Sequence, residues 1–333
     1  MDGSARAAGT PAITGAGADA VTGPDGAGRE APQPGPVVVT GATGNVGRYV
    51  VPLLVAAGVP VRAAVRSPAT SPQQFLRDGV ERVVLDWQDP GTWGAAFVGA
   101  RSIFVVRPPH LSRPRTQMLP ALRAAEHAGV EHVVLLSLQG AQTNRMVPHA
   151  ALEAWARDSG LTWTFVRPSF FMQNLLGTHR AEIRDTDEVV VPAGRGATAF
   201  VDTQDVAAVA VAALLDPAGH AGRAWTPTGP AALTYDQVAA VLSAELARPV
   251  RYRRPGMVRY VRHARAGGMP WAMVAVTSGI YTLARLGRAS GLTDDVAHVT
   301  GRPPTGLAAF VHREREAWLP RRSGSPDGAT MGG

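Results

Sequence analysis

The sequence contains no cysteine and no lysine. Without cysteine the protein has no disulfides, no thiolate nucleophile and no cysteine-ligated zinc or iron–sulfur centre, and its composition fits a reducing compartment. All 33 basic residues are therefore arginine, so no proton-transfer step can use a lysine side chain. Any chemistry must come from other residue types.

The sequence also lacks a secretory signal and a long uninterrupted hydrophobic run. Residues 1–35 are rich in Gly, Ala, Pro and Asp, and we expect a disordered tail there and a second one at 321–333. The longest apolar stretch, 269–287, contains Pro270 and Arg285, and it predicts a buried or pocket-covering helix rather than a membrane span. We therefore expect a cytoplasmic protein that does not enter a membrane.

The charge balance is basic, with a formal net charge of +7. The arginines are scattered, however, which favours a solvated face or a site for an acidic small molecule over nucleic-acid binding. They form no more than short clusters, such as Arg251, Arg253, Arg254 and Arg259, Arg262, Arg265.

Short β-branched segments alternate with helical segments from residue 36 onward. Apolar strands separated by helices predict an α/β fold, namely a Rossmann-type, doubly wound parallel sheet that is covered on both faces. The expected strands are 36–40, 59–65, 82–87, 102–106, 132–137 and 161–166. The expected helices include one that ends near 57, one that begins at Asp89-Pro90, and others near 115–128 and 148–158.

The alternation becomes less regular after residue 166, which predicts a smaller C-terminal α/β substrate lobe. We expect a cofactor-binding core at 36–167, to which 197–216 returns, and a substrate or lid lobe made of 168–196 and 217–320. Within these segments the sequence predicts short strands at 188–193, 197–202 and 248–252, a helix at 205–216 capped by Asp205, and a capping box formed by Thr234 and Gln237.

A glycine-rich turn joins the first strand to the first helix. In this context Gly41 allows a tight turn, Gly44 lets the backbone approach a pyrophosphate, and Gly47 permits close packing of helix on strand. The free N–H groups at the helix start would then face the anion. The predicted cofactor-binding residues of this turn are Thr40, Gly41, Thr43, Gly44, Asn45, Val46 and Gly47.

The end of the second strand indicates which dinucleotide is bound. An acidic residue there would accept from the ribose hydroxyl of NAD, but this chain has Arg66 and Ser67, with Arg62 earlier on the strand. A guanidinium and a hydroxyl suit a 2′-phosphate, so NADP(H) is preferred over NAD(H), unless Arg66 is simply an exposed strand end. Further along the chain, Asp86 and Trp87 are expected near the adenine and Pro108 near the nicotinamide ribose.

Ser137 and His149 are the candidate catalytic residues. Ser137 ends the fifth strand and His149 starts the next helix, where a nicotinamide ring and a substrate carbonyl would meet. His149 would donate a proton near neutral pH, and Glu153, on the same helical face, would hold its ring or its charge. The alternative is that His149 merely caps the helix or faces solvent.

Several segments taken together resemble the NmrA-like atypical short-chain dehydrogenase/reductases. They are "VVVTGATGNVGRYVV", "VRAAVRSP", "HVVLLSLQGA", "HAALEAWARDSGLTWTFVRPSFFMQNLL", "AFVDTQDVAAVAVAALLDP" and "TPTGPAALTYDQVAAVLSAELARPVRY". The resemblance runs from about 36 to 318 and implies a Rossmann core, a small lobe that closes over the cofactor, and NADP(H) binding. It also implies that Phe170 lies beside the cofactor and that Phe171, Met172 and Asn174 line the substrate pocket.

The chain departs from its relatives in its catalytic residues. The Tyr-x-x-x-Lys pair of classical short-chain reductases cannot exist without lysine, and His149 stands where the phenylpropanoid reductases have a catalytic lysine. Tyr281-x-x-x-Arg285 mimics the spacing only by coincidence, because arginine keeps its proton.

Two main hypotheses follow, and neither needs a metal. The first is an NADPH-dependent oxidoreductase that reduces a small quinone or carbonyl compound, with Trp271, Met273 and Tyr281 near the pocket mouth. The second is a non-catalytic NAD(P) sensor that binds a regulatory protein partner. A tailoring enzyme that uses the cofactor structurally, and a homodimer, also stay open.

Overall fold

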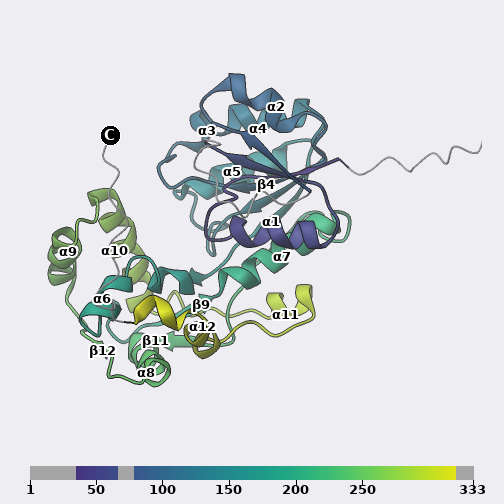
Figure 1. Ribbon diagram of the computed structural model, residues 1–333. Coiled ribbons are helices and arrows are strands. Elements are labelled where there is room, and N and C mark those ends of the chain that lie inside the picture. Colours follow the sequence, from purple (N-terminus) through teal and green to yellow (C-terminus); the bar gives the residue numbers. More distant parts are fainter. Residues whose placement is uncertain (1–34, 67–78, 320–333) are drawn as a thin grey trace, which may run out of the picture. The chain divides into compact units, whose positions relative to one another are not determined.

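The computed structural model describes residues 35–66 and 79–319. The predicted tails, apart from Gly35, and the predicted contact of Ser67 lie outside these residues. The centre of the fold is a seven-stranded sheet with the order β10-β6-β5-β4-β1-β2-β3 (Figure 1). Its strands are β1 (Val37–Val39), β2 (Val61–Val65), β3 (Val80–Val84), β4 (Ser102–Val106), β5 (His132–Leu136), β6 (Thr162–Val166) and β10 (Arg223–Trp225).

Every neighbouring pair of strands in this sheet is parallel, so the predicted doubly wound α/β fold is confirmed. All residues of β1, β2 and β5 are buried, as expected for strands covered on both faces. Parallel strands end at the same edge of the sheet, so the glycine turn after β1 and the segments that follow β4, β5 and β6 share one edge.

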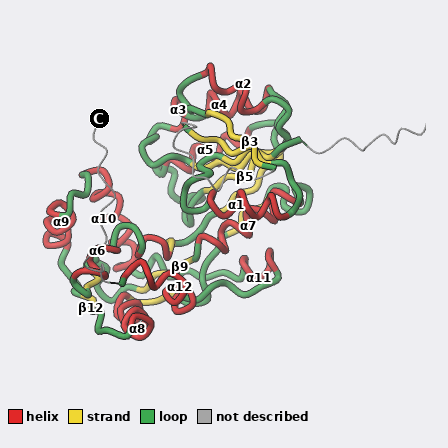
Figure 2. Tube along the Cα trace, viewed as in Figure 1, coloured by secondary structure: helices red, strands yellow, loops and turns green. Residues whose placement is uncertain are grey.

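Helices cover both faces of the sheet (Figures 1 and 2). On one face α1 (Gly47–Ala56) and α7 (Thr203–Leu215) pack against each other and form a core with the strands. On the other face lie 3₁₀ helix η3 (Pro90–Thr92) and helices α2 (Trp93–Phe97), α3 (Pro114–Gln117), α4 (Leu119–His127) and α5 (Pro148–Asp158). Helices α2, α4 and α5 contribute to the core there.

The rest of the described chain forms a third hydrophobic cluster. It contains a sheet of β7 (Phe170–Phe171), β9 (Ala197–Val201) and β11 (Ala232–Thr234), and the pair β8 (Glu188–Val189) and β12 (Arg251–Tyr252). Its helices are η4 (Met172–Leu175), α6 (Arg180–Asp185), α8 (Tyr235–Leu246), α9 (Met257–Ala266), α10 (Trp271–Arg285), α12 (Leu307–Glu314) and η5 (Arg315–Trp318), whereas α11 (Asp295–Thr300) contacts α7. This cluster contains most of the predicted lobe and also β9, which was predicted to return to the core, and the domain boundaries stay a prediction.

Three helix starts were predicted from their caps, and the structure confirms two of them. The Asp89 side chain accepts from the Gly91 amide at the start of η3, and Thr234 and Gln237 form the complete capping box of α8. The predicted cap of α7 was wrong. The helix begins two residues earlier, and the carboxylate of Asp202 accepts from the Gln204 amide. Asp205 is instead fully buried and accepts from the Thr305 amide.

Two further expectations need correction. The third strand spans 80–84 instead of 82–87, so Asp86 and Trp87 follow the strand and do not belong to it. Helix α10 is not a buried helix, because only Val274, Tyr281 and Ala284 are buried along its length. Trp271 is 64% exposed.

Candidate functional site

The glycine turn is built so that side chains cannot occupy it. Gly41 has φ +60°, a conformation that disfavours a side chain, and a Cβ there would contact Val106 of β4. A Cβ on Gly47 would lie 2.2 Å from the Gly41 carbonyl oxygen, so the α1 helix can approach the turn only with glycine at this position. Gly44 is exposed, and a Cβ there would lie 3.1 Å from the same oxygen.

The turn leaves hydrogen-bond donors free. Gly44 N–H donates to the Gly41 carbonyl, but among the described residues the amides of Thr43, Asn45 and Val46 have no acceptor. Arg48, two residues after Val46, has a buried Nε that also lacks an acceptor among the described residues. Four unused N–H donors at the start of a helix form a cradle for an anion such as a pyrophosphate.

Thr40 does not have a free hydroxyl. Its Oγ donates to the Phe104 carbonyl at 2.9 Å and accepts from the Val106 amide at 2.8 Å, and the residue is buried. Thr40 therefore joins the ends of β1 and β4, and its predicted role as a cofactor ligand is limited to positioning the turn.

The end of β2 presents one free arginine. Arg66 is exposed and makes no ion pair among the described residues. Arg62, in contrast, is committed to Glu81 at 2.8 Å and to the carbonyls of Ala96 and Val98, so it has no free donor fork for a phosphate. Arg66 is left as the candidate for the 2′-phosphate.

The two residues predicted near the adenine have different environments. Asp86 is exposed and its Oδ1 accepts from the Gln88 amide. Trp87 is 7% exposed and packs in the hydrophobic cluster beneath α2 and α4, so it offers little surface for stacking. Pro108 is half-buried at the carboxyl end of β4.

Ser137 belongs to a buried cluster that sequence reasoning did not identify. Ser137 Oγ donates to Glu153 Oε1 at 2.7 Å. Arg167, at the end of β6, donates to both carboxylate oxygens of Glu153 at 2.9 and 2.6 Å, and Arg157 adds a third ion-pair contact at 2.9 Å. Burial alone would raise the pKa of Glu153, but the hydrogen bonds from Arg167 and Ser137 hold that pKa below its usual range. Glu153 is therefore ionised and can only accept.

Glu153 does not hold the His149 ring through a hydrogen bond, contrary to one of the two expected roles, although its charge acts to raise the pKa of His149. The Glu153 oxygens are taken by Ser137, Arg157 and Arg167, and the buried Nδ1 of His149 has no partner among the described residues. Burial, together with the nearby charge of Arg107, lowers the pKa of His149 to about 4. The imidazole is therefore neutral near pH 7, so His149 cannot supply the proton as an imidazolium.

The aromatic segment after β6 lies partly in the core. Phe170 and Phe171 are half-buried, Asn174 is half-exposed, and Met172 is 1% exposed within the third hydrophobic cluster. Met172 therefore packs in the core rather than on an open pocket wall. Of the predicted substrate residues, Phe171 and Asn174 keep accessible surface.

The predicted pocket mouth needs a similar correction. Trp271 and Met273 are exposed, but Tyr281 is 2% exposed and its hydroxyl lies 2.7 Å from His179 Nε2. Tyr281 also packs edge-on against Tyr235 and Tyr260. Tyr281 is therefore a core residue of the third hydrophobic cluster, and its predicted place at the pocket mouth was wrong.

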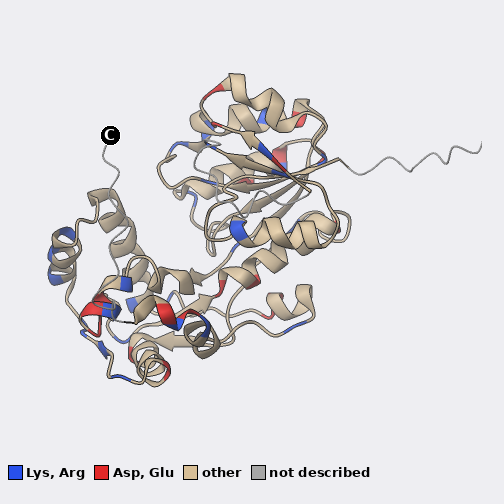
Figure 3. Ribbon diagram, in the orientation of Figure 1, with Lys and Arg blue, Asp and Glu red and all other residues tan. Residues whose placement is uncertain are grey.

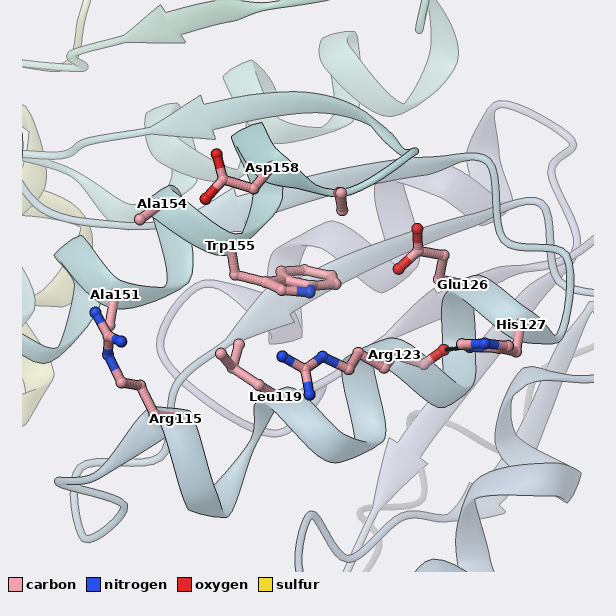
Figure 4. A pocket seen from close by; sticks show the side chains of 10 residues that line it. Arg115, Leu119, Arg123, Glu126, His127, Ala151, Ala154, Trp155 and Asp158 are labelled. Carbon is pink, nitrogen blue, oxygen red and sulfur yellow. Dashed lines mark hydrogen bonds between the residues drawn. The ribbon is translucent and has the colours of Figure 1, made fainter.

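A hollow of about 610 Å³ lies between α4 and α5, and no residue of the glycine turn lines it (Figure 4). It is lined by Arg115, Leu119, Arg123, Glu126, His127, Ala151, Ala154, Trp155, Asp158 and Ser159. None of these is a predicted site residue. The hollow lies on the outer side of the helices that cover the sheet.

The charges do not gather on one face. Basic and acidic residues are interspersed along the ribbon (Figure 3), and Arg253 and Arg254 of the predicted clusters pair with Glu188 and Asp236. Within residues 35–66 and 79–319, no group of three or more acidic or histidine side chains could hold a metal ion. No helix in those ranges is long and apolar enough to cross a membrane.

Comparisons with known proteins agree on the family. The model of the NmrA-like family matches residues 34–262. The chain is 38% identical over 290 residues to the NAD(P)H azoreductase of Xenophilus azovorans, covering 85% of this chain and 99% of that protein. It is 35% identical over 292 residues to the (4-alkanoyl-5-oxo-2,5-dihydrofuran-3-yl)methyl phosphate reductase of Streptomyces griseus, with 85% and 99% covered.

A solved structure of an oxidoreductase is similar to this chain over nearly the whole length of that oxidoreductase. The NADPH-dependent quinone oxidoreductase of Escherichia coli, in complex with NADPH, superposes with a TM-score of 0.76 at 25% identity. The match covers 84% of this chain and 99% of that one.

Proposed function

Because the chain belongs to the NmrA-like family, we propose that it is an NADPH-dependent oxidoreductase that reduces a small quinone or carbonyl compound by hydride transfer. The observation that carries the proposal is the glycine turn. Its unused amide donors and its three glycines form a cradle of the kind that holds a dinucleotide pyrophosphate. The azoreductase, phosphate-ester reductase and quinone oxidoreductase named above support the reaction class.

The residues present fit a nicotinamide dinucleotide. The amides of Thr43, Asn45 and Val46 would hold the pyrophosphate, and the unpartnered Nε of Arg48 would supply an additional charge-assisted hydrogen bond. Arg66 would bind the 2′-phosphate, which is the basis for preferring NADP(H) over NAD(H). When bound, the cofactor supplies the hydride.

Ser137 acts as an acceptor in this proposal. Its proton is committed to the ionised Glu153, so toward a ligand the hydroxyl oxygen presents only lone pairs. Ser137 would therefore orient an N–H donor, such as a carboxamide, instead of polarising a substrate carbonyl. Arg167 is a positioning residue, because it holds the carboxylate that holds Ser137.

Water is the proton source in this proposal. His149 is neutral near pH 7 and could give up only an imidazole N–H proton, which is a very weak acid. Reduction of a quinone by one hydride and one proton gives a hydroquinone. The oxyanion produced first is stabilised by its aromatic ring, so the lack of a strong general acid is tolerable for this substrate class.

The experiment that tests the proposal follows NADPH oxidation by purified protein with a panel of quinones, aldehydes and azo dyes. Turnover of a quinone or carbonyl compound is expected. Gly44→Ala should weaken NADPH binding at least about tenfold, because the new methyl lies where the backbone must approach the pyrophosphate. Gly94→Ala is the matched control, since a Cβ at Gly94 in α2 meets nothing within 4 Å.

Two observations favour a second function, that of a dinucleotide sensor. The chain has no tyrosine–lysine pair, and His149 is neutral. A protein that binds NADPH through Gly44 but turns over none of these compounds would be a dinucleotide sensor and not a reductase. That result would overturn the proposed activity and leave cofactor binding in place.

A further inference from the structure

Arg107 carries a charge that the protein does not neutralise. The residue follows β4 directly, at the edge of the sheet that also holds the glycine turn and His149. Its Nη1 donates to the carbonyls of Pro108, Pro109 and Leu111 at 2.9, 3.1 and 3.0 Å. Its Nε is buried and has no acceptor among the described residues. The guanidinium is thus held in place through Nη1, whereas Nε has no hydrogen-bond acceptor from the residues that the structure describes.

No carboxylate balances this cation within the described part of the chain, where Arg107 makes no ion pair. Burial lowers the pKa of Arg107, as expected for a cation removed from water without a counter-ion. A half-buried, uncompensated charge costs free energy. A ligand with an anionic group near the guanidinium would offset that cost.

The position of Arg107 restricts which ligand this is. Arg107 lies close enough to His149 for its charge to contribute to the lowered pKa of that imidazole. Glu153 makes its hydrogen bonds and ion pairs to Ser137, Arg157 and Arg167, and within the described residues no such contact joins it to Arg107. Arg107 therefore belongs to the part of the edge where the proposed hydride transfer takes place.

The anionic groups of NADPH already have other partners in the proposed complex. The pyrophosphate faces the amides of the glycine turn and Arg48, and the 2′-phosphate faces Arg66 at the end of β2. Arg107 is an additional cation, on a different strand and beside a neutral histidine.

We propose that Arg107 binds an anionic substituent of the substrate, such as a sulfonate, carboxylate or phosphate, and makes the site selective for acidic acceptors. This inference rests on the proposed function for its location. It is independent of turnover, because an anion can be bound without being reduced.

The test compares one neutral and one anionic ligand of the same size class, 1,4-naphthoquinone and 1,4-naphthoquinone-2-sulfonate. Each is titrated calorimetrically into the NADP⁺-loaded protein. Arg107→Met keeps most of the side-chain volume and removes the charge. It should weaken binding of the sulfonate by about ten- to a hundredfold and leave the neutral quinone within about threefold. Arg113→Met is the control, because Arg113 is an exposed arginine after the same strand.

Three outcomes would overturn the inference. Equal weakening of both quinones would show that Arg107 only shapes the loop at 108–111. Weakened NADPH binding in Arg107→Met would assign the cation to the cofactor phosphates. Unchanged sulfonate binding would show that Arg107 contacts no ligand anion. Sulfonate binding that depends on Arg107 without any turnover would support the inference and contradict the proposed activity, so the two can fail separately.

Discussion

Two groups of buried polar side chains lie at the same edge of the seven-stranded sheet, and they differ in one respect. In the first group, Ser137, Glu153 and Arg167 satisfy one another through hydrogen bonds of 2.6 to 2.9 Å. In the second group, Arg48, Arg107 and His149 each have a buried nitrogen without a partner among the described residues.

The difference indicates which group mainly supports the fold and which mainly binds a ligand, although the Ser137 oxygen of the first group also faces the ligand in the proposed complex. When all members of a buried polar network are hydrogen-bonded to one another, these bonds offset the free energy lost on removing the members from water. Removing one member therefore destabilises the fold. An unpaired buried donor costs free energy in the unliganded protein, and a ligand that pairs with it recovers that energy on binding. The first group should therefore affect stability, and the second group binding.

The largest expected effect is on stability, from Glu153→Ala. This change leaves Arg167, which is 8% exposed, buried without its counter-ion, and should lower the free energy of unfolding by about 3–5 kcal/mol. Urea denaturation measures this. The control is Glu131→Ala, whose exposed carboxylate lies 3.7 Å from Arg101 and should contribute less than about 1 kcal/mol. Equal losses of unfolding free energy in the two variants would contradict the special role of the mutually hydrogen-bonded first group in stability.

A smaller effect is expected on cofactor choice, from Arg66→Asp. Loss of a guanidinium–phosphate contact and the added repulsion should weaken NADPH binding about ten- to a hundredfold, while NADH binding changes less than about threefold. Fluorescence titration with both cofactors measures this. Arg82→Asp on the neighbouring strand β3, also exposed, should change neither. A parallel loss for NADH and NADPH would contradict the assignment of the 2′-phosphate to Arg66.

The smallest effect is expected on the pH dependence of turnover, from His149→Gln. With a pKa of about 4 against an ordinary 6.5, His149 stays neutral down to about pH 5.5, so kcat/KM should show no ionisation of this residue between pH 5.5 and 8. The wild-type and variant profiles should be parallel within about twofold. A step near pH 6.5 that disappears in His149→Gln would restore the histidine as the proton donor.

The same pKa has a consequence for stability. The pKa of folded His149 lies below its ordinary value, so its neutral form favours the native state. That contribution is fully present above about pH 6.5 and is lost as the pH falls toward 4. His132, whose pKa is also lowered to about 4 by burial, adds to the loss in the same range.

Local signals predicted much of the fold. The strand at 102–106 and the helix at 148–158 have the predicted bounds, because apolar runs and a proline at the first helical position depend on neighbouring residues alone. The capping box at Thr234 followed in the same way. The Asp202 cap was missed because Asp205 also fits the capping pattern, and only burial of its carboxylate against the Thr305 amide distinguishes the two.

The candidate site was less predictable from sequence than the fold. Helical spacing placed Glu153 on the face of His149, but spacing gives no information on competing partners from other elements. Arg167, directly after β6, binds that carboxylate instead. The sequence around Tyr281 is compatible with a place in a pocket or in the core, and only the tertiary structure shows that the residue is buried. The apolar pattern of α10 did not determine which face has a partner.

The sequence by itself determined the parallel α/β sheet, the glycine turn with its exposed amides and the lack of a tyrosine–lysine pair, because these depend on periodicity, on backbone conformations open only to glycine, and on composition. The tertiary structure alone decided that Ser137 donates a hydrogen bond to Glu153, that His149 is neutral and that Arg107 has no counter-ion among the described residues. Those properties depend on which charges from separate strands meet at one sheet edge, and on which of them are shielded from water.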